Sequence, residues 1–242
     1  MHALSFGQAA SLYDAIRPSY PREAIQFALG KEPKHVLDIG AGTGLLTRAL
    51  LDAGHRVTAV EPDENMLNQL RENLPNIDAH VAPAEKLPLD DNSVDAVMAG
   101  QSFHWFDPDL ALPEIKRVLI PEGTFAPIWN VRDHTVDWIR AMSDATGISS
   151  ADHTAVIADT PGFFGPHFPE PELKIFNHEY PVTGEGLIKL MQSRSNYITA
   201  DEPGKAELNN KLQDLIDNHP DLRGKDKFNL PYLTYVFKLH QD

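Results

Sequence analysis

A glycine-rich turn near the start of the chain limits the fold more than any other feature of the sequence. The stretch Val36–Gly44 reads Val-Leu-Asp-Ile-Gly-Ala-Gly-Thr-Gly and lies at the end of a short apolar run. Glycines let the backbone turn tightly and approach a ligand closely, because they carry no side chain and tolerate positive φ angles. The turn therefore predicts a buried strand at His35–Ile39 and then a helix at Leu45–Ala53, which Gly54 ends.

The region from Lys34 to Asn130 continues this alternation of short apolar runs and helical periodicity. Further strands are expected at Arg56–Val60, Ile77–Ala82, Val94–Gly100 and Gly123–Asn130. Further helices are expected at Glu64–Asn73 and at Pro113–Leu119, the second with proline at its first position. Strands that alternate with helices predict an α/β fold with a parallel sheet and helices on both faces.

The alternation breaks after Asn130. Strands are expected at Leu173–Tyr180 and Phe228–Leu239, helices at Val136–Gly147, Glu185–Ser195 and Lys205–Asn218, and the stretch Asp159–Pro171 is crowded with Pro, Gly and Phe. We expect one domain in which residues 34–130 bind the ligand and residues 1–33 form a helical lid. Residues 131–242 would complete the sheet and form a substrate cap.

Composition excludes several classes of function. The chain has no cysteine, which excludes a thiol nucleophile, a thiolate zinc site and an iron–sulfur cluster. A net charge of −14, without a basic patch, disfavours nucleic acid and anionic membranes as partners. The start of the chain has no signal-peptide pattern, and no apolar run is long enough to span a membrane. We therefore expect a soluble, cytoplasmic protein.

Histidines give no indication of a metal site. His153, His167, His178, His219 and His240 show no spacing that is typical of metal ligands, so no metal is expected.

Two acidic residues indicate which ligand the glycine turn binds. Glu61 follows the second expected strand, where a Rossmann fold places the acid that binds ribose hydroxyls. The spacing G-x-G-x-G, with Leu45 where a further glycine would stand, departs from the G-x-G-x-x-G of dinucleotide sites. Asp38 would repel a pyrophosphate but attract the ammonium and sulfonium groups of S-adenosylmethionine (SAM). The pattern therefore favours SAM over NAD, and over a turn that is merely a tight connection.

The stretch Lys34–Asn130 resembles the class I SAM-dependent methyltransferases, in particular the small-molecule group sometimes called type 11, which includes the ubiquinone-biosynthesis and trans-aconitate enzymes. A looser resemblance extends to Phe6–Gln8, Arg17–Pro21 and Phe103–Asp107. It implies a Rossmann-like fold with a mostly parallel seven-stranded sheet.

The resemblance also implies roles for individual residues. Asp38 and the backbone of Gly40, Ala41, Gly42 and Gly44 would hold the methionine part of SAM, and Glu61 the ribose. Pro62 and Met66 would flank adenine, and Ala84 and Glu85 would meet its edge. Many relatives carry an acid where this chain has Pro83. Proline supplies neither a carboxylate nor an N–H, so adenine recognition would fall to Glu85 or to backbone groups.

Methyl transfer requires mainly that the nucleophile be aligned with the methyl group and water excluded. His104 follows the fourth strand and is a candidate base, or else part of an aromatic brace with Trp105 and Phe106. Gln101 could contact the methionine or the acceptor, or bond only to backbone. Tyr13 could close over the cofactor, or belong to a helix packed on the sheet.

Aromatic and basic residues gather after the fifth strand. An acceptor pocket could be lined by Trp129, Arg132 and Trp138 together with Trp105 and Phe106. Arg132 would bind an acidic group of the acceptor there. We expect transfer of a methyl group to a small molecule that bears a carboxylate, which needs no base. Two alternatives stay open: methylation of a macromolecule, and a regulatory protein that binds SAM or S-adenosylhomocysteine (SAH) without catalysis.

Overall fold

The computed structural model describes residues 17–147 and 163–241. Its strands are β1 (His35–Ile39), β2 (Arg56–Glu61), β3 (Asp78–Val81), β4 (Val94–Gly100), β5 (Leu119–Arg132), β6 (Glu172–Val182) and β7 (Phe228–His240). Its helices are α2 (Arg22–Leu29), α3 (Leu45–Asp52), α4 (Glu64–Asn73), α5 (Pro108–Val118), α6 (Asp137–Thr146), α8 (Gly184–Gln192), α9 (Ser195–Ile198) and α10 (Glu202–Asn218). A 3₁₀ turn covers Phe103–Trp105.

The strands form one seven-stranded sheet in the order β3-β2-β1-β4-β5-β7-β6. Pairings among β1 to β5 are parallel, whereas β7 runs antiparallel to both β5 and β6. The strand order reverses between β1 and β4, which is where open α/β sheets bind ligands, beyond the carboxyl ends of the strands. The expected α/β fold with a mostly parallel seven-stranded sheet is confirmed.

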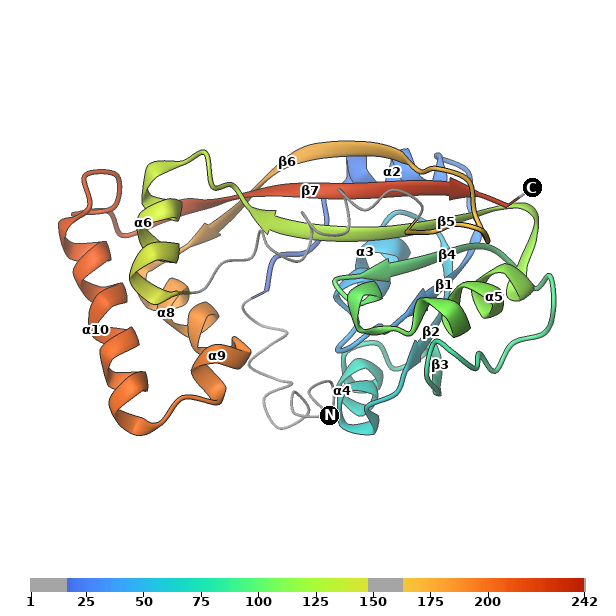
Figure 1. Ribbon diagram of the computed structural model, residues 1–242, viewed down its shortest axis with the longest axis horizontal. Helices are drawn as coiled ribbons and strands as arrows, with labels where there is room; N and C mark the ends of the chain where they lie inside the picture. The colour runs from blue at the N-terminus through green and yellow to red at the C-terminus, as the bar shows by residue number, and fades with distance from the viewer. Residues whose placement is uncertain (1–16, 148–162, 242) are drawn as a thin grey trace.

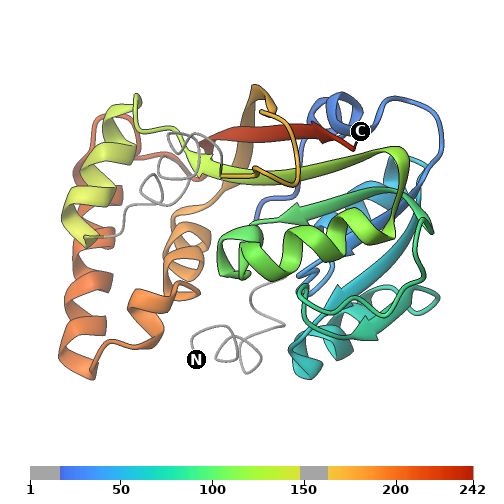
Figure 2. The ribbon, with the colours of Figure 1, turned by 45° about the vertical axis from the view of Figure 1, so that its right-hand side comes forward.

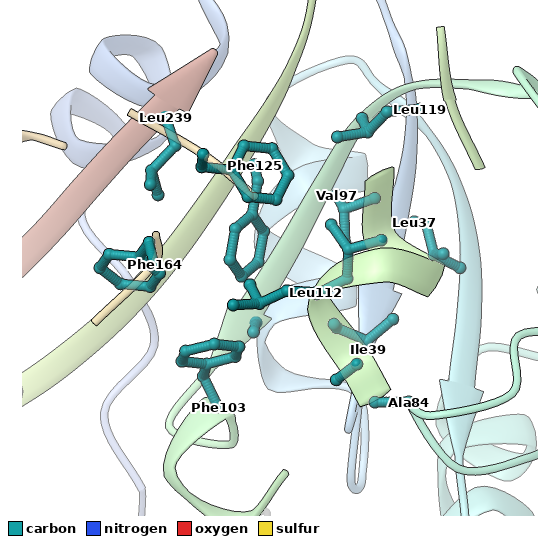
Figure 3. Packing of buried hydrophobic residues seen from close by; sticks show 14 of the residues in the cluster. Leu37, Ile39, Ala84, Val97, Phe103, Leu112, Leu119, Phe125, Phe164 and Leu239 are labelled. Atoms are coloured by element: carbon teal, nitrogen blue, oxygen red, sulfur yellow. The ribbon is translucent and has the colours of Figure 1, made fainter. Parts of the chain in front are cut away.

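Helices cover both faces of the sheet. One core cluster joins α2 and α3 to the sheet through residues such as Ile25, Leu50 and Met98. The cluster on the other face joins α5 to the sheet, and Figure 3 shows its centre, where Phe103, Phe125 and Phe164 pack beside Leu112. Phe103 lies 5.5 Å from Phe164, centroid to centroid, so the turn that follows β4 is anchored in this core.

Helices α6, α8, α9 and α10 gather at one end of the molecule, and we call this group the helical cap (Figures 1 and 2). The long strands β5, β6 and β7 join it to the rest of the sheet (Figure 1). Its core contains Trp138, Leu187 and Leu212, and also Phe228 and Tyr232 from β7. The carboxyl end of β5 therefore leads from the glycine turn toward the cap.

Helix α5 begins earlier than the sequence predicts. The prediction that it starts at Pro113 is wrong, because the helix starts at Pro108 and Pro113 lies inside it. Asp107 caps the helix by accepting a hydrogen bond from the backbone N–H of Asp109 at 3.1 Å. Pro113 cannot donate to the carbonyl four residues earlier, and that carbonyl belongs to the exposed residue Asp109.

Among the other expected elements, His35–Ile39, Glu64–Asn73 and Val94–Gly100 are confirmed with the predicted ends, and the rest are present with shifted ends. Strand β5 extends beyond both ends of the expected Gly123–Asn130, and α10 starts at Glu202 rather than Lys205. The expected helix Glu185–Ser195 ends at Gln192, after which α9 begins. Helix α2, part of the expected lid, packs against the sheet, and residues 1–16 lie outside the described residues.

Candidate functional site

The glycine turn after β1 needs glycine for two different reasons. Gly40, Gly42 and Gly44 have φ angles of +64°, +57° and +94°. A Cβ on Gly40 would lie 2.6 Å from the Cβ of Ser102, a distance that side chains do not adopt. Among the described residues, a Cβ on Gly42 would meet only the Sδ of Met66, at 3.9 Å. Gly40 thus seats the turn against β4, and Gly42 leaves its backbone open to a ligand.

Glu61 ties this turn to the end of β2. One carboxylate oxygen accepts from the backbone N–H of Gly42 and the other from that of Asp63, both at 2.9 Å. The side chain is 6% exposed, and burial raises the pKa of its carboxyl above the usual value despite these two hydrogen bonds. Glu61 therefore fixes the distance between the turns after β1 and β2, and retains lone pairs for a ligand hydroxyl.

Asp38 lies beneath the turn and is fully buried. Its Oδ2 accepts from the Thr47 hydroxyl at 2.6 Å, while Oδ1 has no hydrogen-bond partner among the described residues. Burial raises the pKa of Asp38 to about 7, and the nearby Glu61 charge adds to the effect against the hydrogen bonds from Thr47. A buried carboxyl with one unmet oxygen is suited to a cationic group of a ligand.

The turns after β2 and β3 carry four expected ligand residues. Pro62 is exposed and Met66 is buried on α4, whose first turn Asp63 caps by accepting from the N–H of Asn65 and Met66. Ala84 is buried in the core. The Oε1 of Glu85 accepts from the backbone N–H of Asp107 at 2.8 Å, so this acid holds the start of α5 to the turn after β3.

Gln101 and Ser102 close the site at the end of β4. The backbone of Gln101 has a φ of +56°, a strained conformation for a residue other than glycine. Its side-chain amide donates to the carbonyl of Asn130 at 2.8 Å, which joins the ends of β4 and β5. The Ser102 hydroxyl donates to the carbonyl of Ile39 at 2.9 Å and so joins β4 to β1.

His104 does not have the hydrogen bonding expected of a base. The indole N–H of Trp129 donates to His104 Nδ1 at 3.3 Å. In a neutral imidazole the other nitrogen, Nε2, then carries the proton, so the free lone pair that a base needs is engaged by Trp129. Trp105 is 51% exposed, and Phe106 lies 3.2 Å from the position that a Cβ on Gly40 would take. The segment therefore covers the glycine turn.

The three residues expected after β5 do not share one surface. Successive side chains of a strand point to opposite faces, so Trp129 and Arg132 leave β5 on different sides. Trp129 packs against Phe237 in the core that contains α5, whereas Arg132 reaches Met191 Sδ on α8 at 3.4 Å. Trp138 packs edge-on against Phe228 inside the helical cap, with 5.6 Å between the ring centroids.

Sequence reasoning missed Thr47, Ser102 and Asp63. Thr47 follows Asp38 by nine residues, which is the one signal that a hydroxyl in the first turn of α3 could face it. The Ser102 hydroxyl donates to the carbonyl of Ile39 and the Asp63 N–H to Glu61, and no residue pattern indicates such contacts. Tyr13 lies outside the described residues.

The described residues, 17–147 and 163–241, bear on two further features, membrane-spanning helices and metal sites. No helix in these ranges is long and apolar enough to cross a membrane. In the same ranges, no three His, Asp or Glu side chains come close enough together to hold a metal ion.

Comparison with known proteins gives a consistent result. A family model described as a methyltransferase domain matches residues 37–126. An uncharacterised methyltransferase of Mycobacterium tuberculosis is 39% identical over 96% of this chain and 93% of its own. The malonyl-[acyl-carrier protein] O-methyltransferase of Geobacter sulfurreducens is 37% identical over half of each chain. A solved Anaeromyxobacter dehalogenans protein, named as a type II methyltransferase, superposes with a TM-score of 0.66 over 93% of this chain and 97% of its own, at 26% identity.

Proposed function

We propose that this chain, which belongs to the class I SAM-dependent methyltransferases, transfers the methyl group of SAM to a carboxylate oxygen of a small organic acid. The methyltransferase domain matches residues 37–126, and this range contains the glycine turn, Glu61 and Gln101. The chemistry that SAM supplies when bound is an activated methyl group on a sulfonium, which is an excellent leaving group.

The described residues fit SAM. The buried Asp38 Oδ1, which has no hydrogen-bond partner among the described residues, would accept from the ammonium group. Glu61 would accept from the ribose hydroxyls through the lone pairs that Gly42 and Asp63 leave unused. Pro62, Met66 and Ala84 would surround adenine, with Glu85 held next to them by Asp107.

The contact between Trp129 and His104 is the observation that carries the choice of acceptor. A phenol, an amine or a carbon acid benefits from a base, and here the lone pair of His104 Nδ1 already accepts from the indole. A carboxylate is ionised at neutral pH and needs none. In the transfer, a carboxylate oxygen forms a bond to the methyl carbon while the carbon–sulfur bond breaks. The electron pair of that bond goes to sulfur, and no proton moves.

The comparisons support the same choice of acceptor from a different direction. The Geobacter relative is named as an enzyme that methylates malonyl-[acyl-carrier protein] on oxygen, and it matches half of this chain. That name describes the relative, and the proposal takes from it only that a related sequence performs O-methylation.

A turnover assay with isotopically labelled SAM and a panel of small carboxylic acids tests the proposal. Methyl esters are released as methanol in base, whereas methylated phenols, amines and carbons are stable. We expect base-labile product for at least one acid. We also expect His104→Ala to lower the rate less than about tenfold, because loss of a true base would cost roughly 10²–10⁴-fold. His240→Ala is the matched control, since His240 is exposed at the far end of β7.

Two outcomes would overturn this acceptor. A base-stable product would identify a different acceptor atom. Loss of all turnover in His104→Ala, together with a neutral pH limb that disappears in the variant, would identify His104 as a proton acceptor.

A further inference from the structure

Three side chains form a row across the sheet where β5 leads into the helical cap. Arg132 on β5 is paired with Tyr232 on β7, and Tyr232 with His178 on β6. Residues paired across neighbouring strands project to the same face, so these side chains lie side by side. Arg132 and Tyr232 are 1% and 2% exposed. The sheet thus presents a guanidinium and a phenol together in a buried place.

A second guanidinium lies beside this row. Arg132 Nη1 contacts the Sδ of Met191, and Arg17 Nη2 donates to the carbonyl of Ser193 at 3.3 Å, two residues further along. Burial lowers the pKa of Arg132, the neighbouring Tyr232 opposes this shift, and the charge of Arg17 lowers the pKa further. A buried cation with a second, half-buried cation beside it favours the binding of an anion.

The hydroxyl of Tyr232 gives an independent indication of a ligand. This Oη is buried and has no hydrogen-bond partner among the described residues. A buried hydroxyl that makes no bond loses its interaction with water without replacement, so an acceptor is expected to meet it. The guanidinium of Arg132 and the O–H of Tyr232 are both donors, and a carboxylate accepts from both.

The row is too far from the glycine turn to hold the group that is methylated. Gly100, the last residue of β4, is paired with Ile128, and Arg132 lies four residues further along β5. At the usual rise of a strand this is about 13 Å. The guanidinium of Arg132 points away from the turn, because it contacts α8 in the cap.

We infer that Arg132 and Tyr232 anchor a second anionic group of the acceptor, so that the acceptor is an elongated dicarboxylic acid whose near carboxylate receives the methyl group. The near carboxylate would lie by the turn after β4, under Phe106, and the far one between β5 and α8. The identity of the methylated group rests on the proposed function, but the anchoring of the far carboxylate does not.

Kinetics with α,ω-dicarboxylic acids of increasing length, beside monocarboxylic acids of the same length, test the inference. We expect Arg132→Met to raise the KM of the best dicarboxylic acid roughly 30- to 100-fold, and Tyr232→Phe roughly 10- to 30-fold, as for hydrogen bonds to a charged group. The kcat should change less than about threefold, and so should the KM of the matched monocarboxylic acid, because the lost contact positions only the far end.

Two matched variants serve as controls. Arg223→Met removes the charge of an exposed arginine between α10 and β7. Tyr235→Phe removes a hydroxyl from β7 on the opposite face of the sheet. Neither should change the discrimination between the two kinds of acid. Thermal unfolding of each variant shows whether it is folded, and Tyr232→Phe, which keeps the ring, tests the site even if Arg132→Met does not fold.

Calorimetry with the SAH-loaded protein gives a readout that needs no turnover. A dicarboxylic acid should bind at least about tenfold more tightly than the matched monocarboxylic acid, and this preference should disappear in both variants. Equal binding of the two acids, or equal loss of both in the folded variants, would overturn the inference. If the preference is found but no acid yields base-labile product, the anchoring stands and the proposed acceptor atom is wrong.

Discussion

The region around the glycine turn and the region near the helical cap are stabilised by different kinds of contact. Around the glycine turn the contacts are shorter in sequence: Thr47 bonds to Asp38 nine residues away, Gly42 to Glu61 nineteen residues away, and Ser102 to Ile39 across 63 residues. Near the cap they are long: Arg17 bonds to Ser193 across 176 residues, and Asn130 to Ser19 across 111. The ligand that the whole family shares thus binds where one stretch of sequence suffices. The acceptor is expected where distant segments must meet.

The family comparison follows the same division. The methyltransferase domain matches residues 37–126, which contain the glycine turn and end within β5. The cap lies outside this range. If the division is functional, changes in the cap should alter stability or acceptor choice without altering cofactor affinity, and changes near the glycine turn should alter cofactor affinity without altering acceptor choice.

The largest effect is expected in the cap. Trp138→Ala removes a ring that is 4% exposed and packs against Phe228, so it should lower the free energy of unfolding by about 3–5 kcal/mol. SAH affinity, measured by calorimetry below the unfolding range, should stay within about twofold. Trp105→Ala is the control, because that ring is 51% exposed and its loss should cost less than about 1 kcal/mol. A large fall in SAH affinity in Trp138→Ala would contradict the division between the cofactor-binding region and the cap.

Gly40→Ala should give the strongest effect on cofactor binding. The new Cβ would meet Ser102 at 2.6 Å and would also require a φ of +64°. We expect overpacking and backbone strain together to lower the free energy of unfolding by about 2–5 kcal/mol, and we expect SAH affinity to fall as well. Gly30→Ala separates the two causes, because its φ is +83° and no atom of the described residues lies within 4 Å of the new Cβ. Equal losses of SAH affinity in both variants would show that the contact between the new Cβ and Ser102 does not matter for SAH binding.

Asp38→Asn should move stability and cofactor binding in opposite directions. Because the pKa of Asp38 is raised to about 7 in the folded protein, the stability that its neutral form contributes is present at low pH and is lost as pH rises from about 4 through 7. The variant escapes this loss and should be more stable at pH 8 by on the order of 2–4 kcal/mol.

SAM binding should instead weaken in Asp38→Asn, because the anion that faces the ammonium group is gone. In the parent protein SAM affinity should fall as pH drops below about 7, and this dependence should vanish in the variant. Denaturant titrations and SAM calorimetry between pH 5 and pH 8 give both quantities. Unchanged SAM affinity in the variant would remove Asp38 from the site.

Glu61→Ala should have the smallest of these effects. It removes the acceptor for the expected ribose hydroxyls and for the N–H of Gly42 and Asp63, so SAH affinity should fall by about 1.5–3 kcal/mol while the fold stays intact. Glu64→Ala, an exposed acid on the first turn of α4, is the control in the same calorimetric titration. A folded variant with parental SAH affinity would show that Glu61 is not the ribose acid.

The division also explains what could be predicted from sequence. The strand–turn–helix at His35–Asp52 and the position of Glu61 follow from local pattern, because glycine and the apolar period act within a few residues. The start of α5 could not be read from Pro113, because the cap at Asp107 decides it. That Trp129 and Arg132 face opposite sides follows from strand alternation once β5 is known to extend to Arg132. The meeting of Arg132 with Met191 depends on the packing of α8, which no local pattern encodes.

Calorimetric titration of the parent protein with SAH and, separately, with NADH tests the central claim most directly. We predict that SAH binds with micromolar affinity, about −8 kcal/mol, and that NADH shows no comparable binding. This prediction rests on the spacing of the glycine turn and on the acids Asp38 and Glu61, of which Asp38 has an oxygen without a hydrogen-bond partner among the described residues. Tight binding of NADH without any response to SAH would contradict the account.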